Sequence, residues 1–331
     1  MKVGQHGRRE IRGPTVAEEV FGHVSDRGCS VKIPSLKKCP AMVSNIPMSE
    51  GLIPFRGYRT WYRIIGDMAQ TQGSTFPVLL VHGRPVSHES LKPLEWLAQT
   101  GRPVVFYDQL GCGNSDWPDD PSIWEMSLFV DEVDVVRRKL GLEQVHLLGH
   151  SWGGMIAMEY GLTQPHGIVS LTLASASSSR ALSNADIEGL REKLPPYVQE
   201  TLRKHEKAGT TDDPTYQEAD KVFALRHIFR KDPWPKWLMQ SMRHPQKGMV
   251  DMEGWDIRPR LRDITIPTLV TCGRFDICTP AHARLIHEAI PQSELAVFEK
   301  SSHYPHGEET NRFLAVLHNF MTRTEHKLDR H

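Results

Sequence analysis

Residues 145–158 read Val-His-Leu-Leu-Gly-His-Ser-Trp-Gly-Gly-Met-Ile-Ala-Met, so an apolar run ends in Gly-x-Ser-x-Gly and passes directly into a helix-compatible segment. This is the arrangement of a nucleophile elbow, in which a serine lies on a strained turn between a strand and a helix. Gly149 and Gly153 are required there because a side chain would collide with the neighbouring element. The pattern predicts Ser151 as a nucleophile and directs the N–H of Trp152 toward a developing oxyanion. Taken alone, the motif also fits an ordinary glycine-rich turn.

Strand-like and helix-like segments alternate along the chain on both sides of this elbow. Buried-strand patterns occupy residues 59–65, 77–81, 103–107, 168–173, 267–273 and 295–298. Helical patterns occupy residues 123–140, 152–162, 281–289 and 310–321. Repeated units of this kind favour the α/β class, with a mostly parallel central sheet and helices on both faces. Catalytic side chains are then expected at the carboxyl ends of the strands.

The alternation stops between residues 176 and 254. This stretch holds charged, amphipathic helical patterns without a buried-strand pattern, at residues 186–205, 214–230 and 234–244. We expect an inserted helical cap, or lid, over the site, and a peripheral packing lobe is the alternative. Residues 49–175 and 255–331 then form the core. Residues 1–48, rich in Gly, Pro and Arg, are expected to be a flexible extension.

The composition suits a globular enzyme, since 39% of the 331 residues are hydrophobic and 24% are charged. Lys plus Arg equals Asp plus Glu at 40 each, so no net field recruits nucleic acid or an anionic membrane, and a small-molecule partner is expected. Five cysteines, an odd number, indicate free thiols in a reducing compartment. The sequence holds neither a signal-peptide pattern nor the ~18 apolar residues of a membrane span, which predicts a cytoplasmic protein. Its oligomeric state is left open.

Two further candidate residues follow strand-like segments. Asp276 follows residues 267–273 in Gly-Arg-Phe-Asp, and His303 follows residues 295–298 in Lys-Ser-Ser-His. The chain order Ser151, Asp276, His303 is that of a Ser-His-Asp triad on this architecture. A serine hydroxyl needs an imidazole to take its proton and a carboxylate to orient that imidazole. His306 is a rival base, but it lies further from the strand, so His303 is preferred.

From residue 50 to residue 321 the chain resembles the proline iminopeptidase-like serine hydrolases of the α/β-hydrolase superfamily. The matching stretches are residues 53–62, 107–116, 149–154, 254–256 and 279–280. The resemblance implies the α/β-hydrolase fold with a helical cap, the same triad and no cofactor. No metal is expected, because the pairs His146/His150 and His303/His306 have no third ligand at site-like spacing.

Two departures from the family concern the substrate. The family's turn after the third strand resembles His-Gly-Gly-Pro-Gly, and here residues 82–85 read His-Gly-Arg-Pro. The N–H of Arg84 would therefore join that of Trp152 in the oxyanion hole, although a bulky residue adopts glycine's positive φ only at a cost. The Arg84 side chain either points to solvent or binds an anionic group. In the family an acidic residue follows the catalytic aspartate, and here that position is Ile277.

The family's peptidases hold the ammonium group of their substrate with that acidic residue and with a second one in the cap, in a segment for which this chain is too short. An ammonium buried without a carboxylate loses its hydration and gains no partner. Glu218, Asp251 or Glu253 could take over the role, and no spacing selects one of them. The residues predicted to bind substrate are His82, Gly83, Glu218, Trp255 and Ile277.

These observations predict a serine hydrolase that acts through an acyl-enzyme on a small ester, amide or lactone in specialised metabolism. One alternative is a proline iminopeptidase that releases N-terminal residues. A second alternative is a non-hydrolytic protein on the same fold, which binds a ligand or catalyses a rearrangement.

Overall fold

A computed structural model describes residues 46–71, 75–243, 248 and 250–328 of the chain. The predicted N-terminal extension, residues 1–48, lies almost wholly outside the described residues. The strands are β1 (Met48–Phe55), β2 (Tyr58–Ile65), β3 (Val78–Val81), β4 (Val104–Tyr107), β5 (Val145–His150), β6 (Ile168–Ala174), β7 (Thr268–Gly273) and β8 (Ser293–Phe298).

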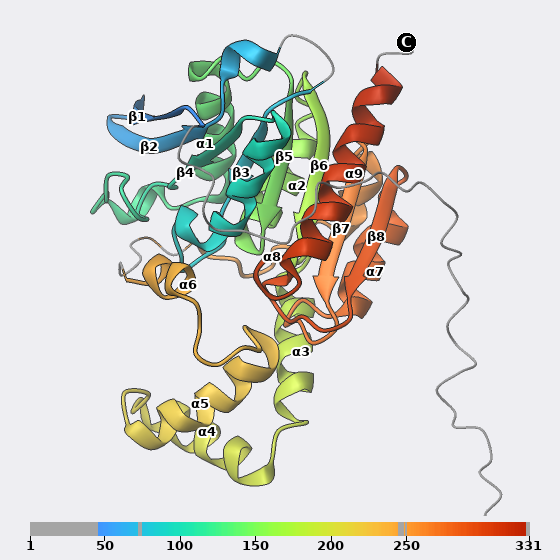
Figure 1. Ribbon diagram of the computed structural model, residues 1–331. Coiled ribbons are helices and arrows are strands. Elements are labelled where there is room, and N and C mark those ends of the chain that lie inside the picture. Colours follow the sequence, from blue (N-terminus) through green and yellow to red (C-terminus); the bar gives the residue numbers. More distant parts are fainter. Residues whose placement is uncertain (1–45, 72–74, 244–247, 249, 329–331) are drawn as a thin grey trace, which may run out of the picture. The chain divides into compact units, whose positions relative to one another are not determined.

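These strands form one sheet in the order β1-β2-β4-β3-β5-β6-β7-β8 (Figure 1). The strands β1, β2 and β4 pair antiparallel, and all pairs from β4 to β8 are parallel. The predicted α/β class with a mostly parallel sheet is confirmed. Sequence patterns did not indicate β1, an edge strand that is largely exposed and contains Gly51 and Pro54, both unusual inside strands.

Helices cover both faces of this sheet (Figure 1). Within β3, Leu79 and Val81 pack into one core cluster and Val78 and Leu80 into the other, because successive side chains of a strand point to opposite faces. One face is covered by α1 (Met126–Lys139), α2 (Trp152–Leu162) and α7 (Pro280–Ala289). The other face is covered by η2 (His88–Thr100) and α9 (Thr310–Leu328). The short helices are η1 (Met68–Thr71), η3 (Pro121–Ile123), η4 (Arg258–Asp263) and α8 (Pro305–Glu308).

In the described part of the chain between β6 and β7, four α-helices precede η4, namely α3 (Arg180–Arg191), α4 (Pro196–Ala208), α5 (Pro214–His227) and α6 (Lys236–Ser241). The single helix predicted for residues 186–205 is wrong, because α3 ends at Arg191 and a new helix, α4, begins at Pro196 directly after Pro195. A proline has no N–H and its ring clashes with the preceding helical turn, so it opens a helix more readily than it continues one. Helices α4 and α5 pack on each other through Val198, Leu202 and Ala219.

The two connections of this helical segment to the sheet are joined to each other. Ser179 and Asp256 form an antiparallel bridge, and the Ile257 N–H donates to the Ser178 carbonyl at 3.0 Å. Beyond α5, the Arg230 N–H donates to Glu308 Oε1 at 2.6 Å, and the Arg230 guanidinium lies 3.7 Å from the centre of the Phe275 ring. The helical segment therefore contacts the loop after β7 and helix α8. Its function as a lid stays a prediction.

Candidate active site

Ser151 lies at the turn from β5 into α2 with φ 54° and ψ −119°. A non-glycine residue in this region carries backbone strain, which is typical of functional turns. A Cβ atom at Gly149 would lie 2.1 Å from the Gly153 carbonyl oxygen, and one at Gly153 would lie 2.1 Å from that of Val81. Only glycine fits at either position, so the structure has the elbow geometry that the motif predicts.

Asp276 and His303 meet beside this elbow at the carboxyl ends of β7 and β8. The carboxylate of Asp276 is buried, and its Oδ1 accepts the Nδ1–H of His303 at 2.7 Å and the N–H of Cys278 at 2.9 Å. The two loops are also joined by their backbones, since the Phe275 N–H donates to the Ser301 carbonyl at 3.0 Å. The imidazole is thus held in one orientation, with the tautomer that carries its proton on Nδ1.

His150 connects the strand of the nucleophile to the loop of His303, a contact that sequence reasoning missed. Its Nε2–H donates to the His303 carbonyl at 2.8 Å, and the centres of the two rings lie 4.9 Å apart. Burial holds the pKa of His150 well below its ordinary value, so the ring stays neutral and adds no competing positive charge.

His306, the rival base, is not brought to Asp276. Its ring is buried, and its Nε2–H donates to the Ser90 carbonyl at 3.0 Å. Burial lowers the pKa of His306 to about 4. Of the two candidates, His303 is therefore the one in contact with the carboxylate.

The turn after β3 runs close to Ser151, where the family places an oxyanion hole. A Cβ atom at Gly83 would lie 3.2 Å from Ser151 Cβ. The side chain of Gln109 links this turn to the elbow, because its Nε2–H donates to the His82 carbonyl at 2.7 Å and its Oε1 accepts the Trp152 indole N–H at 2.9 Å. Sequence reasoning missed Gln109, although its position just after β4 was a usable signal.

The Arg84 side chain does not point to solvent, and its binding of an anionic group stays a prediction. Its guanidinium lies 4.6 Å from the ring centre of Phe129, with Trp124 at 5.8 Å and Trp152 at 5.9 Å, and it donates to the Leu110 carbonyl at 3.0 Å. Burial lowers the pKa of Arg84. Its backbone does not adopt positive φ, so a bulky residue is accommodated here without that strain.

The other predicted substrate-binding residues lie in different surroundings. His82 is fully buried, its Nδ1–H donates to the Gly83 carbonyl at 2.7 Å, and burial lowers its pKa to about 4. The Trp255 indole N–H donates to Glu159 Oε1 at 2.9 Å. Ile277, between Asp276 and Cys278, is half-buried, and Glu218 is exposed on α5. Their contacts with substrate stay predictions.

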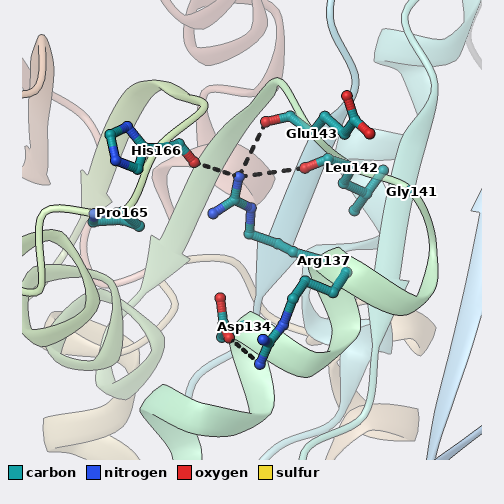
Figure 2. A pocket seen from close by; sticks show the side chains of 8 residues that line it. Asp134, Arg137, Gly141, Leu142, Glu143, Pro165 and His166 are labelled. Atoms are coloured by element: carbon teal, nitrogen blue, oxygen red, sulfur yellow. Dashed lines mark hydrogen bonds and ion pairs between the residues drawn. The ribbon is translucent and has the colours of Figure 1, made fainter.

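A cavity of about 440 Å³ lies at the amino-terminal ends of the strands, opposite the end where Ser151 lies. It borders the turns that lead into β5 and β6, whereas Ser151 lies where β5 ends. Figure 2 shows the Arg137 guanidinium at this cavity, donating to the carbonyls of Leu142, Glu143 and His166. This arginine ties the turn at residues 142–143 to the turn at residue 166, so the cavity belongs to a structural junction and not to the candidate active site.

Residues 77–310 match the family model described as alpha/beta hydrolase fold. The chain belongs to the α/β-hydrolase family. It is 38% identical to a proline iminopeptidase of Heyndrickxia coagulans over 82% of this chain and 98% of that protein. It is 33% identical to a proline iminopeptidase of Clostridium botulinum over 84% of this chain and 99% of that protein.

Solved structures agree with these relatives. This α/β hydrolase superimposes on a proline iminopeptidase of Mycobacterium smegmatis with a TM-score of 0.78 and 33% identity, covering 85% of this chain and 100% of that one. The structure of VinJ gives a TM-score of 0.79 and 36% identity, covering 83% and 99% of the two chains. The protein is thus a proline iminopeptidase-like serine hydrolase. Among its described helices, none combines the length and apolar character needed to cross a membrane.

Proposed function

We propose that this serine hydrolase forms an acyl-enzyme on Ser151, with His303 as the general base and Asp276 as the group that orients and stabilises it. The observation that carries the proposal is the 2.7 Å hydrogen bond from His303 Nδ1 to the buried Asp276 carboxylate, beside a strained elbow. In this mechanism the free nitrogen of His303 takes the Ser151 proton as the hydroxyl attacks the substrate carbonyl, and then gives it to the leaving group. A water molecule then attacks the acyl-enzyme by the same steps in reverse, which frees Ser151 and releases the acid.

The backbone N–H groups of Trp152 and Arg84 are proposed to stabilise the oxyanion. The Trp152 N–H opens helix α2, where the helix dipole favours negative charge. The Arg84 N–H lies in the turn that approaches Ser151, and Gln109 holds that turn against the Trp152 side chain. A donor of this kind typically contributes a factor of about 10² to 10³ in kcat.

For the substrate, we propose a small amide with a free amino terminus, from which the enzyme releases the first residue. Support comes from relatives named proline iminopeptidase at 33–38% identity over most of the chain. Specific residues favour a second candidate, a small uncharged ester, because the position after Asp276 is Ile277 and cannot pair with an ammonium group. Helices α3 to α6, within residues 176–254, are proposed to form the cap that covers the substrate.

Two measurements test these proposals. A serine-directed fluorophosphonate should add its mass to the wild-type protein and leave Ser151→Ala unmodified, and an unlabelled wild-type protein would refute the triad. Next, kcat/KM for a prolyl arylamide should exceed that for its N-acetylated counterpart. A higher kcat/KM for the N-acetylated compound would replace the aminopeptidase by the esterase candidate. The reason is that burial of an unpaired ammonium group costs several kcal/mol, which corresponds to at least about a hundredfold in rate.

A further inference from the structure

Three potential metal ligands converge at the candidate active site. A carboxylate oxygen of Asp276, the sulfur of Cys278 and a ring nitrogen of His303 lie within 4.8 Å of one another. All three residues are buried, and Cys278 is a free thiol. The hydrogen bond from the Cys278 N–H to Asp276 Oδ1, 2.9 Å long, folds the loop after β7 so that both side chains reach the same point.

This set of donor atoms matches a soft or borderline divalent cation. Zinc binds thiolate sulfur at about 2.3 Å and imidazole nitrogen or carboxylate oxygen at about 2.0 to 2.2 Å. Ligand atoms around a tetrahedral ion are therefore roughly 3.3 to 3.8 Å apart, a spacing within the 4.8 Å that encloses these three atoms, so the side chains have only to adjust locally to hold an ion. Thiolate ligands favour zinc and similar soft ions, whereas magnesium and calcium prefer oxygen donors.

We propose that Asp276, Cys278 and His303 form an inhibitory site for a soft divalent cation such as Zn²⁺ or Cd²⁺. When the ion binds, the Cys278 thiol releases its proton to solvent, and the sulfur, the carboxylate and one ring nitrogen of His303 each donate an electron pair. If that nitrogen is Nδ1, its proton moves to Nε2, so the imidazole stays neutral. No atom changes oxidation state. The site is additional to the catalytic role of Asp276 and His303, because Cys278 takes no part in that chemistry.

Inhibition follows whichever ring nitrogen the ion takes. Nδ1 of His303 makes the hydrogen bond to Asp276, and the other nitrogen is the proposed acceptor of the Ser151 proton. Coordination of either one removes the base from its catalytic state. Without the ion, burial and the negative charge of Asp276 raise the pKa of the Cys278 thiol well above its ordinary value, so the side chain stays protonated and unreactive.

The inhibitory effect rests on the proposed function, whereas binding of the ion does not, and the experiment separates the two. Zn²⁺ or Cd²⁺ is titrated against the hydrolysis rate of the wild-type protein, Cys278→Ala, Cys278→Ser and the matched control Cys272→Ala, each relative to its own metal-free rate. Cys272 is also a buried free thiol, but it is not part of the cluster. We expect reversible inhibition that a chelator relieves. The metal concentration for half-inhibition should be at least about tenfold higher in the two Cys278 variants than in the wild-type protein, and unchanged in Cys272→Ala.

Binding is measured directly in Ser151→Ala, which has no activity to inhibit. Cadmium should produce the ultraviolet absorption of a cadmium–thiolate bond in this variant. The band should be absent from the double variant that carries both Ser151→Ala and Cys278→Ala. Equal sensitivity of the wild-type protein and the Cys278 variants, or loss of sensitivity in Cys272→Ala, would overturn the site. A cadmium–thiolate band that depends on Cys278, together with undiminished hydrolysis, would keep the metal site and reject the catalytic role of His303.

Discussion

Replacing Asp276 by Asn tests the proposed mechanism most sharply. Asp276 Oδ1 accepts two hydrogen bonds, from His303 Nδ1 and from the Cys278 N–H, while Oδ2 lies 3.4 Å from the Gly273 N–H. An asparagine must turn its NH2 toward one of these sides, and the long contact to Gly273 is the weaker one to lose. The amide oxygen should therefore keep its contact with His303, so the variant removes charge and preserves the tautomer.

The expected loss follows from that charge. When His303 takes the serine proton it becomes an imidazolium beside a carboxylate, with charge centres roughly 4 Å apart, an attraction of about 4 kcal/mol at an effective dielectric constant of 20. Without it, kcat should fall about a thousandfold with little change in KM. Fluorophosphonate labelling of Ser151 should slow in parallel.

The control is Asp263→Asn, which removes an exposed carboxylate on η4. Circular dichroism and thermal unfolding of both variants establish that they are folded. A loss of less than about tenfold in Asp276→Asn would refute the argument, since an orienting carboxylate worth only ~1.4 kcal/mol stabilises no imidazolium. An equal loss in Asp263→Asn would refute it as well.

Three further results are expected. Gln109→Leu removes the partner of the Trp152 indole N–H and of the His82 carbonyl. The variant should lose about 1–3 kcal/mol of stability in urea unfolding, and its kcat should fall with KM little changed. An unchanged kcat would reject the positioning role of Gln109. The pKa of His306 is about 4 in the folded protein, against an ordinary value of 6.5. Between these pH values the unfolded chain therefore binds more protons than the folded protein does. The neutral, buried ring contributes up to about 3 kcal/mol of stability, which is fully present above pH ~6.5 and is lost as the pH falls toward 4. Comparing urea midpoints of the wild-type protein and His306→Gln at two pH values within this window tests the sign, because the variant should lose less. For the substrate, N-acetylation of a prolyl arylamide should lower kcat/KM, and a rise would favour the ester candidate.

Sequence patterns predicted the central part of the fold because that part obeys local rules. The strands β3, β4, β5 and β7 are buried along their whole length, so each appears as a short apolar run with clear boundaries. The same rules failed where exposure or proline weakened the pattern. Helix η2 is a 3-10 helix that contains Pro93, and periodicity based on 3.6 residues per turn does not detect it.

The candidate site was predictable only as far as strand ends and chain order define it. Those rules indicated Ser151, Asp276 and His303. They could not indicate the hydrogen bonds that His150 and Gln109 make, because a hydrogen bond from a side chain to a distant carbonyl depends on rotamers and on strand register. The course of the Arg84 side chain was open for the same reason, since three aromatic rings from two helices and a loop surround its guanidinium.

The meeting of Asp276 with His303 depends on how closely two loops approach each other. Gly273 pairs with Phe298 at the last position of β7 and β8. A Cβ atom at Gly273 would lie 2.1 Å from the Ser302 carbonyl oxygen, so the loop that carries His303 folds back directly over this glycine. A larger residue at position 273 would push that loop away, lengthen the 2.7 Å hydrogen bond between His303 and Asp276, and separate the carboxylate from the base without altering either residue. The glycine of Gly-Arg-Phe-Asp is therefore needed for the proposed pairing of Asp276 with His303, for a reason that only the packing of the two loops reveals.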